Sequence, residues 1–207
     1  MESDDWLDAL DERLADQLRF LVEIDRLKGV VRANRVADGT RRENTAEHSW
    51  HVAVFASVLA EYAVGEVRVD RVVRMLLIHD IVEIDAGDTP LYEQDVAADH
   101  VEAERRAAER LFGLLPDDQR RAFQALWEEF EAAESVDARF AKALDRLPPI
   151  LLNHAVGGGT WTDYDVDEGQ VRAKTGRIAE GSPALWRAAE TVFADAVERG
   201  WLRAARR

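Results

Sequence analysis

The most restrictive feature of the sequence is a group of ionisable residues at the end of an apolar run. The run VVRMLLI (residues 72–78) is followed at once by His79 and Asp80, and then by Glu83. If the run is helical, this spacing places the three side chains on one face. Their burial at the end of an apolar helix costs free energy unless it is compensated. A divalent metal is one such compensation, and a solvent-exposed helix end with a salt bridge is the alternative.

Apolar residues recur at helical spacing through most of the chain. We predict helices within residues 6–29, 45–64, 70–83 and 97–113, and three more that begin near Pro116, Asp137 and Pro183. No segment alternates polar and apolar residues over a sustained length, as an amphipathic strand would. The predicted class is all-α, a single compact domain over residues 1–207 without an internal repeat.

The composition limits the chemistry that is possible. The chain has no Cys, which excludes disulfides and Cys nucleophiles and leaves N and O atoms as metal ligands. The formal net charge of -14 argues against nucleic acid as the main partner. The acidic start lacks the basic region of a signal peptide, and the apolar runs are too short to span a membrane. We expect a cytoplasmic protein with neither a membrane nor a nucleic-acid partner.

A polar segment with four Arg occupies residues 32–42, between the first two predicted helices. Its Asp38-Gly39 pair predicts a turn. In a chain with this net charge, the segment is either a solvated loop or a local cationic site for an anion.

Further candidate ligands come from two other predicted helices. His48 and His51 open the second helix, three residues apart and on one face. Asp145 lies in an apolar stripe, where an aspartate needs a partner. His154 is nine residues later, about half a turn around the helix and beyond the Pro pair at 148–149, so we prefer Asp145 as a ligand. Two imidazoles and two carboxylates suit a divalent cation with open positions for water.

The ordered set His48, His79-Asp80 and Asp145 resembles the signature of the HD-domain metal-dependent phosphohydrolases. Three motifs resemble the 5'-deoxynucleotidase branch (the YfbR and HD-domain-containing protein 2 type): RENTAEHS at 42–49, HD-x-x-E at 79–83 and GD-x-P at 87–90. The match covers about residues 18–155, the expected HD core, and leaves residues 156–207 as a C-terminal loop and helix.

The resemblance implies a helical fold that binds one divalent metal ion (Mn, Co, Zn, Mg or Fe) through His48, His79, Asp80 and Asp145. It also implies that Glu83 acts on the attacking water and that Asp88 lies near the sugar and the leaving oxygen. Metal-bound water would supply a nucleophile at neutral pH.

In the same family an Arg shortly after the first helix contacts the substrate phosphate. Arg32 and Arg35 are both candidates here, and Ala33 stands where the family has an aromatic residue. Glu47 either supports a metal ligand or interacts with the helix dipole.

The predicted function is therefore removal of phosphate from (deoxy)nucleoside 5'-monophosphates by a homodimer. Hydrolysis of another phosphoester, a nucleoside polyphosphate or an alarmone, is the first alternative. Glu83 and Asp85 loosely resemble the acid pair of such enzymes, although one residue separates them. The second alternative is a non-catalytic regulator that binds a nucleotide or a metal.

Overall fold

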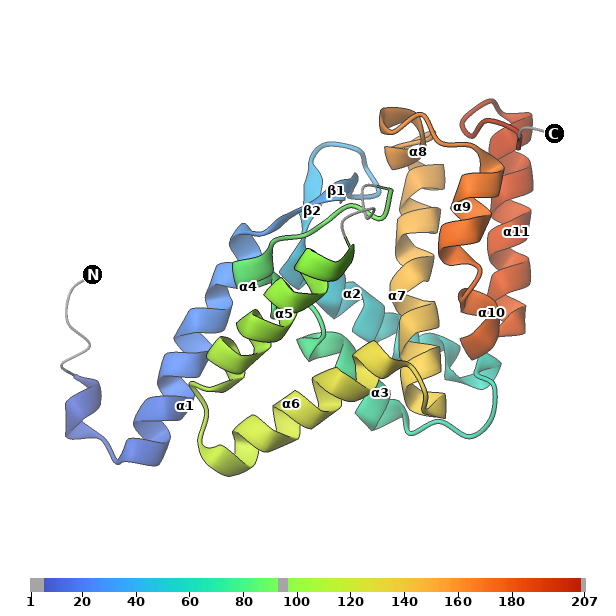
Figure 1. Cartoon of the computed structure of the whole chain (residues 1–207). Helices are drawn as coiled ribbons and strands as arrows, with labels where there is room; N and C mark the ends of the chain where they lie inside the picture. The colour runs from blue at the N-terminus through green and yellow to red at the C-terminus, as the bar shows by residue number, and fades with distance from the viewer. Residues whose placement is uncertain (1–5, 93–96, 206–207) are drawn as a thin grey trace.

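The structure, a computed structural model, describes residues 6–92 and 97–205, and most of these residues are helical (Figure 1). The N-terminal elements are η1 (Leu7–Ala9), α1 (Glu12–Glu23), η2 (Ile24–Gly29), β1 (Val31–Arg35), β2 (Arg42–Asn44), α2 (Thr45–Leu59), η3 (Ala60–Tyr62), α3 (Val69–Ile78) and α4 (Glu83–Ala86). The C-terminal elements are α5 (Ala97–Phe112), α6 (Asp117–Ala132), α7 (Val136–Ala155), α8 (Thr160–Asp163), α9 (Glu168–Thr175), α10 (Ile178–Gly181) and α11 (Pro183–Glu198). The predicted all-α class is confirmed.

The Arg-rich segment forms an antiparallel hairpin of β1 and β2, not the loop expected from its polarity. Val31 pairs with Asn44 and Arg35 pairs with Arg42. The predicted turn is present, with Gly39 at φ 73° and the Asp38 carboxylate accepting the Thr40 N–H at 2.9 Å. Strands of three and five residues that are rich in charge are too short to show alternation, so sequence reasoning missed them.

Helix α7 forms the centre of the molecule. It packs against α2, α3 and α6 on one side and against α10 and α11 on the other, and Figure 1 shows it standing between these two groups. Its apolar face, represented by Phe140, Leu144 and Ile150, is buried in the main core. The helix continues through Pro148 and Pro149 to Ala155, so the two prolines do not end it.

The helix that carries His79 ends earlier than predicted. Helix α3 stops at Ile78, and the next residues form turns in which Ile81 N–H donates to Ile78 O and Glu83 N–H donates to Asp80 O. These are i to i+3 hydrogen bonds, tighter than those of an α-helix. Therefore His79, Asp80 and Glu83 do not share the face of one continuous helix.

Residues 156–207 contain more helix than the single one that we predicted. Helices α8, α9 and α10 are between four and eight residues long. Helix α9, for example, buries just Val171 and Thr175, one turn apart, and a pattern of two positions carries no recognisable period. The assignment of the whole chain to one HD domain stays a prediction. Among the helices of the described residues, none is long and apolar enough to cross a membrane.

The close approach of α10 to α7 gives a stability prediction. A Cβ atom at Gly181 would lie 2.3 Å from Arg139 O and 2.8 Å from Ala143 Cβ. The variant Gly181→Ala is expected to lower the free energy of unfolding by ~1–3 kcal/mol because the two helices must move apart. Denaturant unfolding measures this, with Gly29→Ala as the control because no atom lies within 4 Å of its Cβ position. Equal stability of the two variants would contradict the close packing.

Candidate metal centre and surrounding cavity

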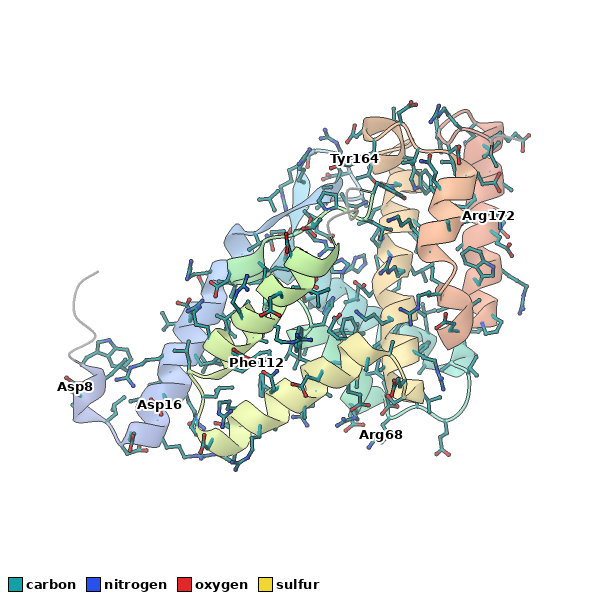
Figure 2. All side chains as sticks on the ribbon, viewed as in Figure 1. Asp8, Asp16, Arg68, Phe112, Tyr164 and Arg172 are labelled. Carbon is teal, nitrogen blue, oxygen red and sulfur yellow. The ribbon has the colours of Figure 1, made fainter. Side chains whose placement is uncertain are left out.

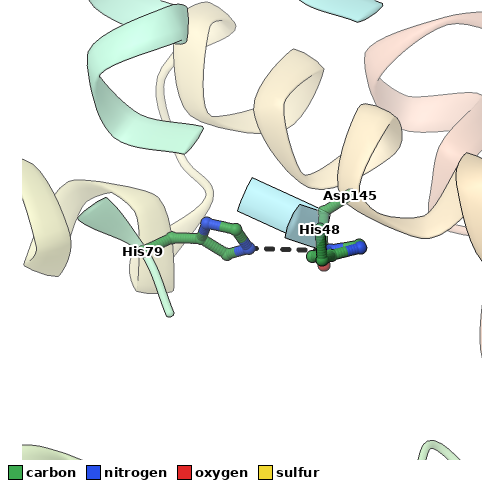
Figure 3. Close-up of side chains that lie close together, drawn as sticks. All are labelled: His48, His79 and Asp145. Carbon is green, nitrogen blue, oxygen red and sulfur yellow. Dashed lines mark hydrogen bonds and ion pairs between the residues drawn. The ribbon is translucent and has the colours of Figure 1, made fainter. Parts of the chain in front are cut away.

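Three side chains from separate parts of the sequence meet in the interior (Figure 3). His48 lies in the first turn of α2, His79 follows α3 and Asp145 lies in the middle of α7. Asp145 Oδ1 is 2.9 Å from His48 Nε2 and 3.4 Å from His79 Nε2. Both imidazoles are buried, at 0% and 3% exposure, and the three residues could hold a metal ion.

Asp80 lies next to this group. Its Oδ1 is 3.1 Å from His79 Nε2, and its Oδ2 accepts a hydrogen bond from Arg32. Burial raises the pKa of Asp80, but the charges of His79 and Arg32 outweigh burial and hold this pKa below its usual range. The predicted fourth ligand thus contacts His79, whereas the donor atoms that all lie within 4.8 Å of one another belong to His48, His79 and Asp145 among the described residues.

The separations between donor atoms fit a metal ion. Ligand atoms that share one metal at about 2.1 Å lie about 3.0–3.5 Å from one another in octahedral or tetrahedral geometry. Asp145 Oδ1 lies 2.9 Å from His48 Nε2 and 3.4 Å from His79 Nε2, and Asp80 Oδ1 lies 3.1 Å from His79 Nε2. Buried N and O donors at this spacing match the ligand preferences of Zn and of the Mn to Co series.

Neighbouring groups orient the two imidazoles. The Nδ1 atom of His79 is 2.8 Å from Leu76 O, which directs Nε2 toward Asp145. The Nδ1 atom of His48 faces Glu43 Oε2 at 3.5 Å, and both atoms are buried without a closer partner among the described residues. In metal-binding histidines, the ring nitrogen that does not bind the metal usually donates a hydrogen bond to a carboxylate or a carbonyl oxygen. Sequence reasoning missed Glu43; its position in the motif at 42–49 was the available signal.

The protonation of His79 reflects its acidic neighbours. Burial lowers the pKa of His79, but the charge of Asp80 and the hydrogen bond to Asp145 outweigh burial and raise this pKa to about 10. The pKa of Asp145 is held well below its usual range by both imidazoles, against the effect of burial. The metal-free centre thus keeps a proton on nitrogen that a metal would have to displace.

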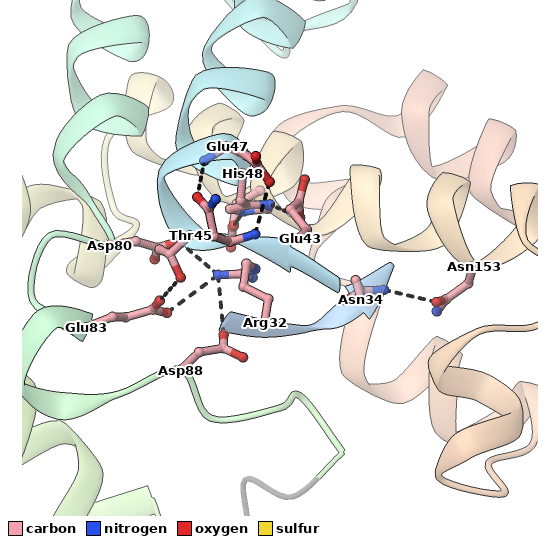
Figure 4. Close-up of polar contacts among 12 residues, drawn as sticks. Arg32, Asn34, Glu43, Thr45, Glu47, His48, Asp80, Glu83, Asp88 and Asn153 are labelled. Atoms are coloured by element: carbon pink, nitrogen blue, oxygen red, sulfur yellow. Dashed lines mark hydrogen bonds and ion pairs between the residues drawn. The ribbon is translucent and has the colours of Figure 1, made fainter. Parts of the chain in front are cut away.

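Arg32 reaches the centre from strand β1 (Figure 4). Its Nη1 atom lies 3.0 Å from Asp80 Oδ2, 3.5 Å from Glu83 Oε1 and 3.3 Å from Asp88 Oδ1. Arg35, the other candidate, is exposed on the hairpin and donates to Gly39 O at 3.5 Å. The structure brings Arg32 to the predicted ligands and leaves Arg35 outside.

Glu83 is a buried carboxyl group with an unusual pKa. Burial and the charge of Asp80 raise the pKa of Glu83 to about 9, although Arg32 acts in the opposite direction. Thr45 Oγ1 donates a hydrogen bond to Glu83 Oε2 at 2.8 Å and holds the group in place. The contact of Thr45 with Glu83 was not predicted, since the two residues are 38 positions apart.

Asp88 contacts the same guanidinium nitrogen of Arg32 as Asp80 does. Burial and the charge of Asp80 raise the pKa of Asp88 above its usual range, although Arg32 and a hydrogen bond from the Ala33 backbone N–H act in the opposite direction. The preceding Gly87 has φ 77° and ends α4, which returns the chain toward β1. Asp88 is thereby brought into direct contact with Arg32.

Other candidate residues have structural roles. Glu47 accepts the Asn44 N–H in a capping box and pairs with Arg41 on the surface. His51 stacks against Trp50 and meets the edge of Phe55, away from the centre. His154 pairs with Asp195 of α11.

A cavity of about 720 Å³ opens over this centre, which is the size of a small-molecule site. The residues that line it include Arg32, His79, Asp80, Glu83, Asp88 and Asp145, together with residues from α5 to α9. The ionisable groups are therefore accessible to a ligand and are not enclosed in the core.

The helical fold and this His–Asp centre define an HD-domain protein. The family model described as an HD domain matches residues 24–186, so the chain belongs to the HD-domain family. The resemblance to HD-domain phosphohydrolases is thereby confirmed.

Individual relatives carry more specific names. The chain is 33% identical over 135 residues to the 5'-deoxynucleotidase HDDC2 of Homo sapiens, a match that spans 65% of this chain and 65% of that protein. It is 29% identical over 143 residues to a 5'-deoxynucleotidase of Klebsiella pneumoniae, which covers 65% of this chain and 71% of that protein. The crystal structure of a predicted metal-dependent phosphohydrolase from Magnetospirillum magnetotacticum MS-1 is similar at TM-score 0.89 and 53% identity, covering 93% of this chain and 96% of that one.

Proposed function

We propose that the protein is a metal-dependent phosphohydrolase that removes phosphate from (deoxy)nucleoside 5'-monophosphates. The observation that carries the proposal is Arg32 among the carboxylates of Asp80, Glu83 and Asp88, beside the candidate metal ligands and lining a cavity. A phosphate needs a cation to bind and a group that moves protons to react, and this centre holds both.

The four candidate ligands suit a divalent metal because they combine two imidazoles with two carboxylates. The centre contains four acids: Asp80, Glu83, Asp88 and Asp145. Arg32 forms ion pairs with the first three of them. We assign His48, His79, Asp80 and Asp145 as the metal ligands. When bound, the metal would lower the pKa of water and polarise the phosphoryl oxygens.

The chain's own residues divide the remaining work. Arg32 binds the phosphate and stabilises its developing negative charge. Glu83 orients a water molecule and moves a proton between that water and the leaving sugar oxygen. Asp88, whose carboxylate contacts Arg32 and accepts the Ala33 N–H, accepts a hydrogen bond from a sugar hydroxyl of the substrate.

One alternative loses support from the position of Asp85. Its carboxylate pairs with Arg110 on the surface and does not join Glu83 in the centre. The acid pair expected of an enzyme that acts on polyphosphates is therefore not assembled here.

The test is phosphate release by metal-stripped protein reconstituted with Mn²⁺, Co²⁺, Zn²⁺, Mg²⁺ or Fe²⁺. Deoxy- and ribonucleoside 5'-monophosphates are the substrates, and nucleoside triphosphates are included to detect pyrophosphate. We expect metal-dependent release of inorganic phosphate from monophosphates. Pyrophosphate as the main product would favour the polyphosphate alternative, and metal binding without any hydrolysis would favour a regulator.

We also propose that the protein is a homodimer. Trp50, Val54 and Val58 recur every four residues on α2 and are 64%, 41% and 65% exposed. Such an apolar stripe on a surface helix is characteristic of a contact between subunits. Light scattering coupled to size-exclusion chromatography measures the molar mass. A monomer at micromolar concentration would contradict the proposal.

A further inference from the structure

The cavity extends well beyond the metal centre along α7. Asp145, Pro149 and Asn153 all line it and recur at one-turn spacing on the same face. Eight residues of α-helix correspond to a rise of about 12 Å. The candidate metal ligands lie at the Asp145 end, so the Asn153 end is free to hold another part of a substrate.

Three aromatic side chains form a wall of the cavity: Tyr92, Trp161 and Tyr164. The ring centroids of Tyr92 and Tyr164 are 6.0 Å apart, with the rings inclined at 47°. Tyr164 follows α8, beside the C-terminal end of α7 (Figure 2). Trp161 is 1% exposed and packs edge-to-face with Phe193 of α11, so it supports this wall from the core side.

Arg146 adds a cation to the same cavity. Its Nη1 atom donates to Lys174 O at 3.0 Å, which anchors the guanidinium and leaves further N–H groups for a ligand. Arg146 and Tyr92 both line the cavity; burial raises the pKa of Tyr92 to about 12, and a hydrogen bond with Trp161 and the charge of Arg146 act against this rise. The aromatic wall is therefore bordered by a group that is purely a hydrogen-bond donor.

The hairpin is tied to this end of the cavity by side-chain amides. Asn34 Nδ2 donates to Asn153 Oδ1 at 2.9 Å, and Asn153 Nδ2 donates to Thr160 Oγ1 at 2.7 Å. Arg32 is two residues before Asn34 on the same strand. The strand that carries Arg32 is thus hydrogen-bonded, through Asn153 of α7, to the start of α8 beside the aromatic wall.

We propose that the part of the cavity lined by Tyr92, Trp161, Tyr164 and Arg146 is a nucleobase subsite, and that Arg146 makes it prefer bases with a carbonyl oxygen. The proposal rests on the proposed function. Nucleobases stack on aromatic side chains. The carbonyl oxygens of guanine and thymine accept hydrogen bonds from a guanidinium, whereas adenine has no carbonyl oxygen and presents an amino donor.

The experiment compares kcat/KM for dTMP, dGMP, dAMP and 2-deoxyribose 5-phosphate with the metal-reconstituted enzyme. We expect dTMP and dGMP to exceed the base-free sugar phosphate by ~10-fold or more, because stacking on the aromatic wall is lost without a base. Calorimetric titration with thymidine and with 2-deoxyribose adds a readout independent of hydrolysis, in which thymidine alone binds.

Two variants separate the contributions of charge and of stacking. Arg146→Met is expected to lower kcat/KM for dTMP and dGMP by ~10-fold and to change dAMP and the sugar phosphate by less than ~3-fold, since one charge-assisted hydrogen bond is lost. Arg139→Met, on the same helix outside the cavity lining, is its control.

Tyr164→Leu is expected to lower kcat/KM for all three nucleotides but not for the sugar phosphate. The control is Tyr62→Leu, at an exposed position outside the cavity.

The outcomes distinguish this proposal from the proposed function. Phosphate release from no substrate at all would overturn the proposed function. Equal kcat/KM for nucleotides and for the base-free sugar phosphate would leave the function standing and overturn the subsite. A preference for dAMP over dTMP and dGMP would overturn the role of Arg146.

Discussion

Replacing Glu83 by Gln is expected to lower kcat for phosphate release by ~10²- to 10⁴-fold, the usual contribution of a general acid–base group. Gln has the shape of Glu but cannot take up or release a proton. Glu83 is outside the proposed ligand set, so the metal content of the purified protein should not change. Steady-state kinetics and elemental analysis of the same samples measure both quantities.

A suitable control for Glu83→Gln is Asp85→Asn, which removes a nearby charge on the surface. It should change kcat by less than ~3-fold. If Glu83→Gln kept more than a tenth of the wild-type kcat at full metal content, the proton-transfer role would be wrong.

The same variant predicts the sign of a pH effect on stability. The pKa of Glu83 is raised from 4.5 to about 9 in the metal-free folded protein. A raised carboxyl pKa favours the folded state at low pH, and this contribution is lost as pH rises from about 4.5 through 9. Because Gln stays neutral, the metal-free Glu83→Gln protein should lose less thermal stability than wild type between pH 6 and pH 9.

Replacing His79 by Gln is expected to reduce metal content below a tenth of the wild-type value and phosphate release to background. The variant loses an imidazole ligand that no neighbour can supply. Wild-type protein should gain ~2.7 kcal/mol of stability at a metal concentration 100 times Kd, and the variant should gain little. His51→Gln is the control, because His51 stacks on Trp50 away from the centre.

Metal affinity of the wild-type protein is expected to rise with pH, by up to about tenfold per pH unit between pH 6 and 8, because one proton must leave the centre. The pKa of His79 is about 10 without metal, raised from 6.5, so its imidazolium favours the folded metal-free state. That stabilisation is complete below about pH 6.5 and is lost as pH rises through 10. Calorimetric titrations over this range measure the slope, and an affinity independent of pH would contradict it.

Much of the helical fold was accessible from sequence, because apolar periodicity is a local property. The apolar residues of α2, α5, α6 and α11 recur at helical spacing, and their predicted ranges agree with the structure to within a few residues. The elements that sequence reasoning missed are the hairpin and α8 to α10. They are too short for a period, and their conformation depends on contacts such as that of Gly181 with Arg139 O.

Local sequence patterns were enough to predict the helical class and to identify the candidate ligands, because an adjacent His and Asp after an apolar run and a lone Asp in an apolar stripe are visible locally. The approach of His48 and Asp145, 97 positions apart, to within 2.9 Å could not be read from spacing along the chain and depends on how the helices pack. The same is true of the contact of Arg32, and not Arg35, with the carboxylates. The physical reason is that spacing along a chain sets which face a side chain occupies, whereas packing of α2, α3 and β1 around α7 sets what that face meets.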